Sequence, residues 1–327
     1  MTKRTPTAAL IALATLGLSQ TARADVPADG TRPPEGSVHW VGARASGTAA
    51  GSRSAGLYGG GAFRDFVHFV SFRLGRSRTR FEARATLVTK CGPRFGDGLV
   101  ETIAVTDGHL SARGAYRASA SFSDQVAPGV PEIGGLHTDG TIDFSARVQS
   151  GGVAVGTARA RTVYRDPQTG ADVSRCDTGS IGWTARLPSS GVGRGTSRPQ
   201  PGVHLGTTAQ GGPFLMSVVR RGRLIARAGM TFLVSCPSAV GLPTDLVANR
   251  VPVSRDGSFD ATGTFRRGFT LDDGTAVLES YAWRLRGHFG HRGATGSFQV
   301  SGVVRRRSDG TRIGSCGTGR NRWRASR

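Results

Sequence analysis

Residues 156–185, GTARARTVYRDPQTGADVSRCDTGSIGWTA, return 140 positions later without a gap as residues 296–325, GSFQVSGVVRRRSDGTRIGSCGTGRNRWRA. Both stretches close on the pattern C-x-T-G-x-x-x-W-x-A, which begins at Cys176 in one and at Cys316 in the other. A repeat of this length shows that the chain holds two copies of one structural unit. The copies therefore have to be analysed as a pair.

Upstream landmarks extend the repeat in the same order. Leu87–Cys91 matches Phe232–Cys236, and Val105–Leu110 is matched here with Ser254–Phe259. The offsets in this region differ slightly from 140, which indicates that a few residues are gained or lost between landmarks. The sequence thus predicts one copy at residues 51–188 and another at 203–327. Residues 189–202, rich in Gly, Ser and Pro, read as a flexible linker between them.

Residues 1–24 have the three parts of a secretory signal. Lys3 and Arg4 are followed by the apolar run from Ala8 to Leu18, and Ala22–Ala24 gives an A-x-A cleavage site. The run is too short to span a bilayer, which needs about 20 residues. We therefore predict a secreted protein, extracellular or in the cell envelope, with no transmembrane segment in the mature chain. Residues 25–50 read as a leader that contains a first strand near 37–41.

The composition of the mature chain predicts an all-β fold. Glycine is abundant, and Val, Ile, Thr and Phe tend to alternate with polar residues, as in Phe66–Arg73. Asp107–Gly108 and Asp256–Gly257 carry the dipeptide most typical of tight hairpins, and Gly170 and Asp309–Gly310 mark a second hairpin in each copy. We predict two tandem antiparallel β-sandwich domains, with a small barrel as the alternative architecture for each copy.

Four cysteines occur, two at equivalent places in each copy. Four cysteines allow three pairings, and duplication of a unit that already held its own bridge favours Cys91–Cys176 and Cys236–Cys316. Export makes oxidation of these pairs plausible. A zinc site is the competing role, but no two cysteines are close enough in sequence to begin one.

The chain is strongly basic, with a formal net charge of +21, and arginine supplies nearly all of it because Lys3 and Lys90 are its only lysines. The second copy holds 19 Arg against 7 acidic residues, whereas the first holds 17 basic against 12 acidic residues. The excess predicts a surface that attracts polyanions. The arginines chosen as the contact surface are Arg305, Arg306, Arg307, Arg320, Arg322 and Arg324. A solvated edge strand, protected from aggregation by its charges, is the plainer interpretation.

No catalytic motif is present, since the sequence lacks G-x-S-x-G and H-E-x-x-H. Asp272 and Asp273 precede a glycine and are typical of a turn. His288 and His291 are flanked by glycines and have no counterparts in the first copy, which argues against a metal site. We therefore predict a protein that is not an enzyme, with no cofactor and no metal.

Two tryptophans, Trp183 and Trp323, stand seven residues after a cysteine and are predicted to be core aromatics packed over the disulfide. The alternative is an exposed stacking platform for sugars. Trp40 and Trp283 have no counterpart in the other copy, so either is a candidate for a surface contact.

The second copy begins with G-x-T-x-Q-G, formed by Gly206, Thr208, Gln210 and Gly211, and ends with C-x-T-G-x-x-x-W-x-A. In this combination it resembles the uncharacterised secreted β-sandwich repeats of GC-rich bacteria. The first copy departs at its head, where the residues from Tyr58 to Gly61 read YGGG. The resemblance implies the fold and export but no activity.

Together these observations predict a secreted, non-catalytic binding or envelope-associated module whose basic second domain contacts an anionic cell-envelope polymer or glycan. Because the chain is expected to be exported, we do not expect nucleic acid to be its partner. A carbohydrate-binding β-sandwich that uses exposed aromatics is the alternative function, and an enzyme of unknown class is the third.

Overall fold

The computed structural model describes residues 20–23, 35–41, 53–92, 97–125, 135–189, 199–236, 239–270 and 275–327, and most of these lie in β-strands. The strands of copy 1 are β3 (Gly56–Phe63), β4 (Val67–Leu74), β5 (Arg80–Cys91), β6 (Asp97–His109), β7 (Ala115–Gln125), β8 (His137–Gln149), β9 (Val153–Arg165), β10 (Asp172–Asp177) and β11 (Ile181–Arg186). Those of copy 2 are β12 (Gly202–Thr208), β13 (Pro213–Val219), β14 (Leu224–Cys236), β15 (Ala239–Pro252), β16 (Ser258–Thr270), β17 (Ala276–Gly290), β18 (Gly293–Arg306), β19 (Arg312–Gly317) and β20 (Asn321–Ser326). A 3₁₀ turn, η1 (Arg220–Gly222), follows β13.

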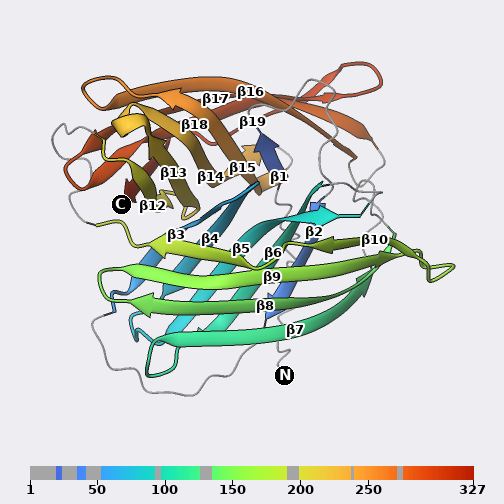
Figure 1. Cartoon of the computed structure of the whole chain (residues 1–327). Helices are drawn as coiled ribbons and strands as arrows, with labels where there is room; N and C mark the ends of the chain where they lie inside the picture. Colours follow the sequence, from blue (N-terminus) through green and yellow to red (C-terminus); the bar gives the residue numbers. More distant parts are fainter. Residues whose placement is uncertain are drawn as a thin grey trace, which may run out of the picture.

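The two copies have the same topology. Strand order is β6-β5-β4-β3-β11-β9-β8-β7 in copy 1 and β15-β14-β13-β12-β20-β18-β17-β16 in copy 2, with antiparallel pairing throughout both series. The short strands β10 and β19 pair with two strands each, β10 with β5 and β9, and β19 with β14 and β18. Each sheet curls back on itself, so β7–β9 lie across β3–β6 as a second layer (Figure 1). The all-β prediction of two tandem domains is confirmed, and the two layers are wings of one continuous sheet.

The tryptophan of each repeat fills the space between the layers. Trp183 is 2% exposed and stacks on Phe144 at 5.6 Å between ring centroids. A Cβ atom added at Gly156, its partner on β9, would lie 2.5 Å from the Trp183 ring. Trp323 is 1% exposed and has the same relation to Gly296. The glycine and the tryptophan of the repeat are therefore two halves of one packing contact.

The Thr-Gly pair of the repeat lies between the last two strands of each copy and hydrogen-bonds to the strand that pairs with both of them. The Thr178 hydroxyl accepts a hydrogen bond from the Ala160 amide at 3.0 Å and donates one to the Gly179 carbonyl at 2.8 Å. Thr318 makes the same two bonds in copy 2. Gly179 has a φ of +63°, a conformation that glycine adopts without strain. The Thr-Gly part of the motif therefore has a structural role, since it fixes the connection between the last two strands.

Both predicted disulfides are present, Cys91–Cys176 and Cys236–Cys316, one in each half of the chain. In copy 1 the bridge joins directly opposed residues of β5 and β10. Each bridge closes a loop of 80 or more residues. In copy 1 the bridge therefore links the short strand β10, which also pairs with β9, to β5 in the other layer.

The expected packing of tryptophan over the disulfide is wrong in copy 1. Trp183 lies opposite Gly156 on β9, whereas Cys176 lies opposite Thr162 on the same strand. Six residues of strand separate these positions, which is about 20 Å. Cys176 packs in a separate small cluster with Tyr164. Trp283, considered as a surface contact, is buried in the core of copy 2, and the side chain of Trp40 lies outside the described residues.

One predicted hairpin is also wrong. Asp107–Gly108 lies inside β6, where the register with β5 shifts and Asp107 adopts a φ of +51°. The turn between β6 and β7 lies instead at residues 111–114, where the Gly114 amide bonds to the Ser111 carbonyl. The Gly257 amide bonds to the Ser254 carbonyl in the same way. Ser111 rather than Val105 is therefore the counterpart of Ser254. The second predicted hairpin, at Gly170 and Asp309–Gly310, closes β9–β10 and β18–β19 as expected.

Two N-terminal strands add to equivalent edges of the sheets. β2 (Glu35–Val41) runs parallel to β6, which places the expected first strand in copy 1. β1 (Gln20–Arg23) runs parallel to β15 and belongs to the stretch expected to be removed on export. The rest of the expected signal, residues 1–19 and 24, and residues 190–198 of the expected linker lie outside the described residues.

The copies contact each other through an apolar cluster. Val67 and Phe69 of β4 pack with Leu205, Leu215 and Val247 of copy 2, and all five are buried. This packed contact opposes the free motion between copies that the linker suggested.

The backbones of the two copies also approach closely beside this cluster. A Cβ atom at Gly59 of β3 would lie 1.9 Å from the carbonyl oxygen of Gly206 of β12. The Arg227 guanidinium adds a hydrogen bond of 2.9 Å to the Arg64 carbonyl. Only glycine at position 59 allows β3 and β12 to meet at this distance.

Candidate polyanion-binding face

The six arginines chosen from sequence fall into two groups on copy 2. Arg305, Arg306 and Arg307 lie at the end of β18 and in the turn to β19, whereas Arg320, Arg322 and Arg324 lie on or next to β20. All six are exposed. Arg322 is paired with Ser297, eight residues before Arg305 on β18, so about 26 Å of strand separates the groups. They form two surfaces.

The second group, the β20 arginines (Arg320, Arg322, Arg324), points outward as predicted. The residues between them, Asn321 and Trp323, are buried, and Ala325 beyond them is also buried. This alternation follows from the two-residue period of a strand. Arg320 stands one residue before the strand and continues the same row.

Strand register places a second basic row opposite the first. On β17, Arg284, Arg286 and His288 alternate with buried residues and are exposed. Arg286 pairs with Ser297 on β18, which pairs in turn with Arg322 on β20. Two inter-strand spacings, about 9.6 Å, therefore separate the two basic rows.

Between these rows lies a shallow trough of about 780 Å³. Its lining includes Arg286, His288, Thr295, Ser297, Arg320 and Arg322, and it extends to Ser258, Phe259 and the Asp260 carboxylate on β16. Arg324 continues the β20 row just beyond this lining. The outward residues of β18 at its floor, Thr295 and Ser297, have short side chains, whereas Gly296 between them faces the core and packs against Trp323. Long basic side chains on β17 and β20 thus stand above a low polar floor.

The two rows differ in whether their arginines form ion pairs within the protein. Asp260 on β16 binds Arg284 through both carboxylate oxygens and also pairs with Arg286 at 3.1 Å. The β20 arginines form no ion pair with any residue in the described parts of the chain. Their charge is therefore the part of the trough that an anionic ligand can neutralise.

Copy 1 provides a direct comparison at the same positions. The constant offset of 140 places Ser180, Gly182 and Thr184 where copy 2 has the β20 arginines. Copy 1 also carries acids on this face. Asp143, which accepts a hydrogen bond from Ser119, stands at the place of Arg284.

An ion pair next to these positions shows the same difference. Asp177 in copy 1 pairs with Arg159 at 2.6 Å, and the Arg159 guanidinium holds the pKa of that carboxyl below its usual value. The corresponding residues of copy 2 are Gly317 and Gln299. The outer face of copy 1 is therefore balanced in charge, and the same face of copy 2 is basic.

The group at Arg305–Arg307 is organised differently. Arg305 donates to the Gly310 carbonyl, and Arg306 pairs with Asp309 at 3.0 Å in the hairpin turn. Hydrogen bonds from Thr311 and the nearby Arg306 lower the pKa of Asp309. These contacts hold the turn together, so this group has less unpaired charge than the β20 arginines.

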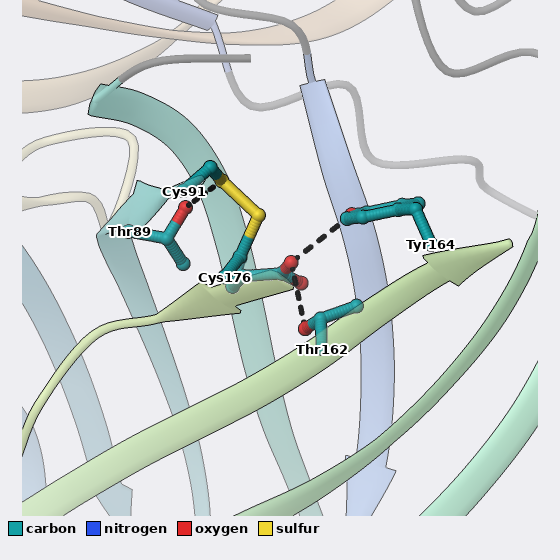
Figure 2. The surroundings of a disulfide bond; sticks show 6 residues. Thr89, Cys91, Thr162, Tyr164 and Cys176 are labelled. Carbon is teal, nitrogen blue, oxygen red and sulfur yellow. Dashed lines mark hydrogen bonds between the residues drawn. A yellow bond between two sulfur atoms is a disulfide. The ribbon is translucent and has the colours of Figure 1, made fainter. Parts of the chain in front are cut away.

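The surroundings of the disulfides are the other place where polar groups gather. Glu101 is fully buried and accepts hydrogen bonds from the Thr162 and Tyr164 hydroxyls at 3.0 and 3.1 Å. Figure 2 shows both hydroxyls beside the bridge, with the Thr89 hydroxyl close to the Cys91 sulfur. Both hydroxyls donate to Oε1 of the buried carboxyl, which fits a structural role.

In copy 2 the buried Glu279 lies with Cys236 and Cys316, and their ligand atoms are within 4.8 Å of one another. Both sulfurs are committed to the disulfide, so the group offers a metal ion only one carboxylate. We assign no metal site here.

The β17 side of the trough is not among the residues predicted from sequence. Arg284, Arg286 and His288 alternate with Trp283, Leu285 and Gly287, and this period of two was visible in the sequence. Their closeness to the β20 arginines was not visible, because it depends on β17 and β20 both pairing with β18.

No family model, curated protein or solved structure matches the chain. Among the described residues, no helix has the length and apolar character needed to cross a bilayer.

Proposed function

We propose that this is a secreted, non-catalytic module that binds an anionic polymer of the cell envelope through the trough of copy 2. The contrast between the copies carries the proposal. One fold presents Ser180, Gly182 and Thr184 in copy 1 and three arginines in copy 2, at positions where a surface side chain is free to vary. If composition alone had set the charge, both copies would carry it.

Export is supported by two observations. Two disulfides are present, which persist in oxidising compartments. The signal pattern of residues 1–24 points the same way. The first residue of the exported chain is expected to be Asp25.

Sugar binding by aromatic stacking, the alternative function, would need exposed aromatic rings, and the tryptophans best suited to it are buried. Trp183, Trp283 and Trp323 are each at most 5% exposed, so none offers a ring face to a ligand. We therefore advance no second function.

An exchange of the two copies' residues tests the proposal. The purified protein is incubated with isolated envelope fractions at low and high salt, together with two triple variants. One variant, Arg320→Ser, Arg322→Gly and Arg324→Thr, gives copy 2 the residues of copy 1. The other places arginine at positions 180, 182 and 184 of copy 1.

We expect salt-released binding of the wild type, loss in the first variant and increased binding in the second. Exposed charge contacts are screened by salt, whereas stacking contacts are little affected. Binding that resists salt, or that is equal in all three proteins, would contradict the proposal.

A further inference from the structure

We infer that the trough holds one extended phosphodiester chain of a polyol, lying along β18 between the two basic rows. This inference rests on the proposed function and names the class of polymer. Three properties of the trough lead to it: the spacing of its charges, its width and the nature of its floor.

The spacing of the β20 arginines follows from strand geometry. Successive outward residues of a strand are about 6.7 Å apart, the length of six backbone bonds. A phosphodiester that joins a three-carbon polyol also has six bonds from one phosphorus atom to the next. An extended chain of this kind rises by nearly the same distance per bond, since the bond lengths and angles are similar. Successive phosphates can therefore meet Arg320, Arg322 and Arg324 in register.

The width of the trough favours a chain whose charge lies in its own backbone. The basic rows on β17 and β20 are about 9.6 Å apart, and their long side chains flank the short side chains of Thr295 and Ser297. A narrow phosphodiester chain on this floor brings each phosphate within reach of a guanidinium, which binds phosphate in a bidentate manner. In polyglutamate or polygalacturonate, the charges are carried on side groups of a wider chain.

The floor offers a matching hydroxyl. The Ser297 side chain makes no hydrogen bond with any described residue, and it lies between Arg286 and Arg322 in the register. It can donate to a phosphate oxygen that Arg322 contacts. Thr295, in contrast, already donates to the Trp323 carbonyl.

A single-stranded nucleic acid has the same six-bond repeat, but the trough lacks what its bases need. Such strands are held by base stacking on exposed aromatic rings. Phe259 is the one Phe, Tyr or Trp that lines the trough, and it is 4% exposed. The trough therefore fits the charged chain of a polyol phosphate.

The test compares polymers of equal charge and length by isothermal titration calorimetry at low salt. The polymers are poly(glycerol phosphate), polyglutamate, polygalacturonate and oligo(dT). We expect poly(glycerol phosphate) to bind at least tenfold more tightly than the other three.

A second comparison places the polymer in the trough. Ser297→Ile fills the floor with a β-branched side chain that a strand accepts, without changing any charge. Thr264→Ile makes a matched change on the exposed face of β16. We expect Ser297→Ile to weaken poly(glycerol phosphate) binding at least tenfold and Thr264→Ile to leave it unchanged.

The outcomes separate this inference from the proposed function. Equal binding of all four polymers, or tighter binding of oligo(dT), would overturn the polyol phosphate inference and leave a polyanion-binding face. Full binding by the Ser297→Ile variant would overturn the trough as the site. If none of the polymers binds, both the inference and the proposed function fail.

Discussion

Replacement of the β20 arginines by their copy 1 counterparts should change the salt dependence of binding by a calculable amount. The variant is Arg320→Ser, Arg322→Gly and Arg324→Thr. Each cation that neutralises a phosphate on a single-stranded polyanion contributes about −0.7 to the slope of log K against log salt concentration. Three lost contacts should therefore make the slope shallower by about 2, and at ~0.1 M salt the affinity should fall about 100-fold.

The assay is titration of fluorescently labelled poly(glycerol phosphate) at four or more salt concentrations. A variant with Arg305, Arg306 and Arg307 changed to Ser is the control, because it loses the same formal charge about 26 Å farther along β18. We expect its slope to change by less than half as much. Equal changes in the two variants would refute the reasoning, since they would show that net charge alone sets the affinity.

Three further predictions concern stability. Breaking the second bridge by Cys236→Ser with Cys316→Ser should lower the free energy of unfolding by about 4 kcal/mol, as the chain-entropy model gives for a loop of 80 residues; a loss below 1 kcal/mol in urea denaturation would contradict it. Gly156→Ala should cost about 1–3 kcal/mol by overpacking, because its Cβ would lie 1.9 Å from the Ser145 carbonyl. Gly182→Ala, where nothing lies within 4 Å, should be nearly neutral, and equal melting temperatures of the two variants would argue against this account.

The third concerns pH: burial and the nearby Arg64 lower the pKa of His68 from 6.5 to about 4, and its Nδ1 accepts a hydrogen bond from the Val88 amide. Because the unfolded chain binds the proton first, the contribution of His68 to stability should be constant well above pH 6.5 and fall by about 3 kcal/mol between pH 6.5 and 4. Burial also lowers the pKa of His204, which adds to the loss of stability toward low pH. His68→Gln should flatten this part of the pH profile, and an unchanged profile would exclude His68 as its source.

The repeat made the disulfide pairing predictable, because equivalent cysteines in two copies select one pairing of three. Comparison of the two copies also explains why a hairpin was wrongly predicted at Asp107–Gly108. Asp107–Gly108 resembles a hairpin turn by composition, but the positive φ of Asp107 belongs to an irregularity within β6, where the register with β5 shifts. The real turn at Ser111–Gly114 has the spacing of Ser254–Gly257, a weaker signal that emerges only when both turns are compared.

The outward direction of the β20 arginines was predictable from a period of two, and their exposure agrees with it. The trough was not predictable, because strand periodicity gives the face of a residue but not the strand beside it. The separation of Arg305 from Arg322 has the same cause. Both belong to one basic region of sequence, yet Arg322 of β20 pairs with Ser297, eight residues before Arg305 on β18, so they lie on separate surfaces.

The contact between the copies has a consequence for assembly. Equivalent strands meet there, β3 and β4 from one copy with β12 and β13 from the other, and Val247 of β15 also joins the cluster. Each copy therefore covers the corresponding part of the other's sheet, so this patch is already occupied within one chain. Since the partners are fused, one of them can acquire a charged surface while the other keeps a neutral one, a division that two identical subunits cannot make.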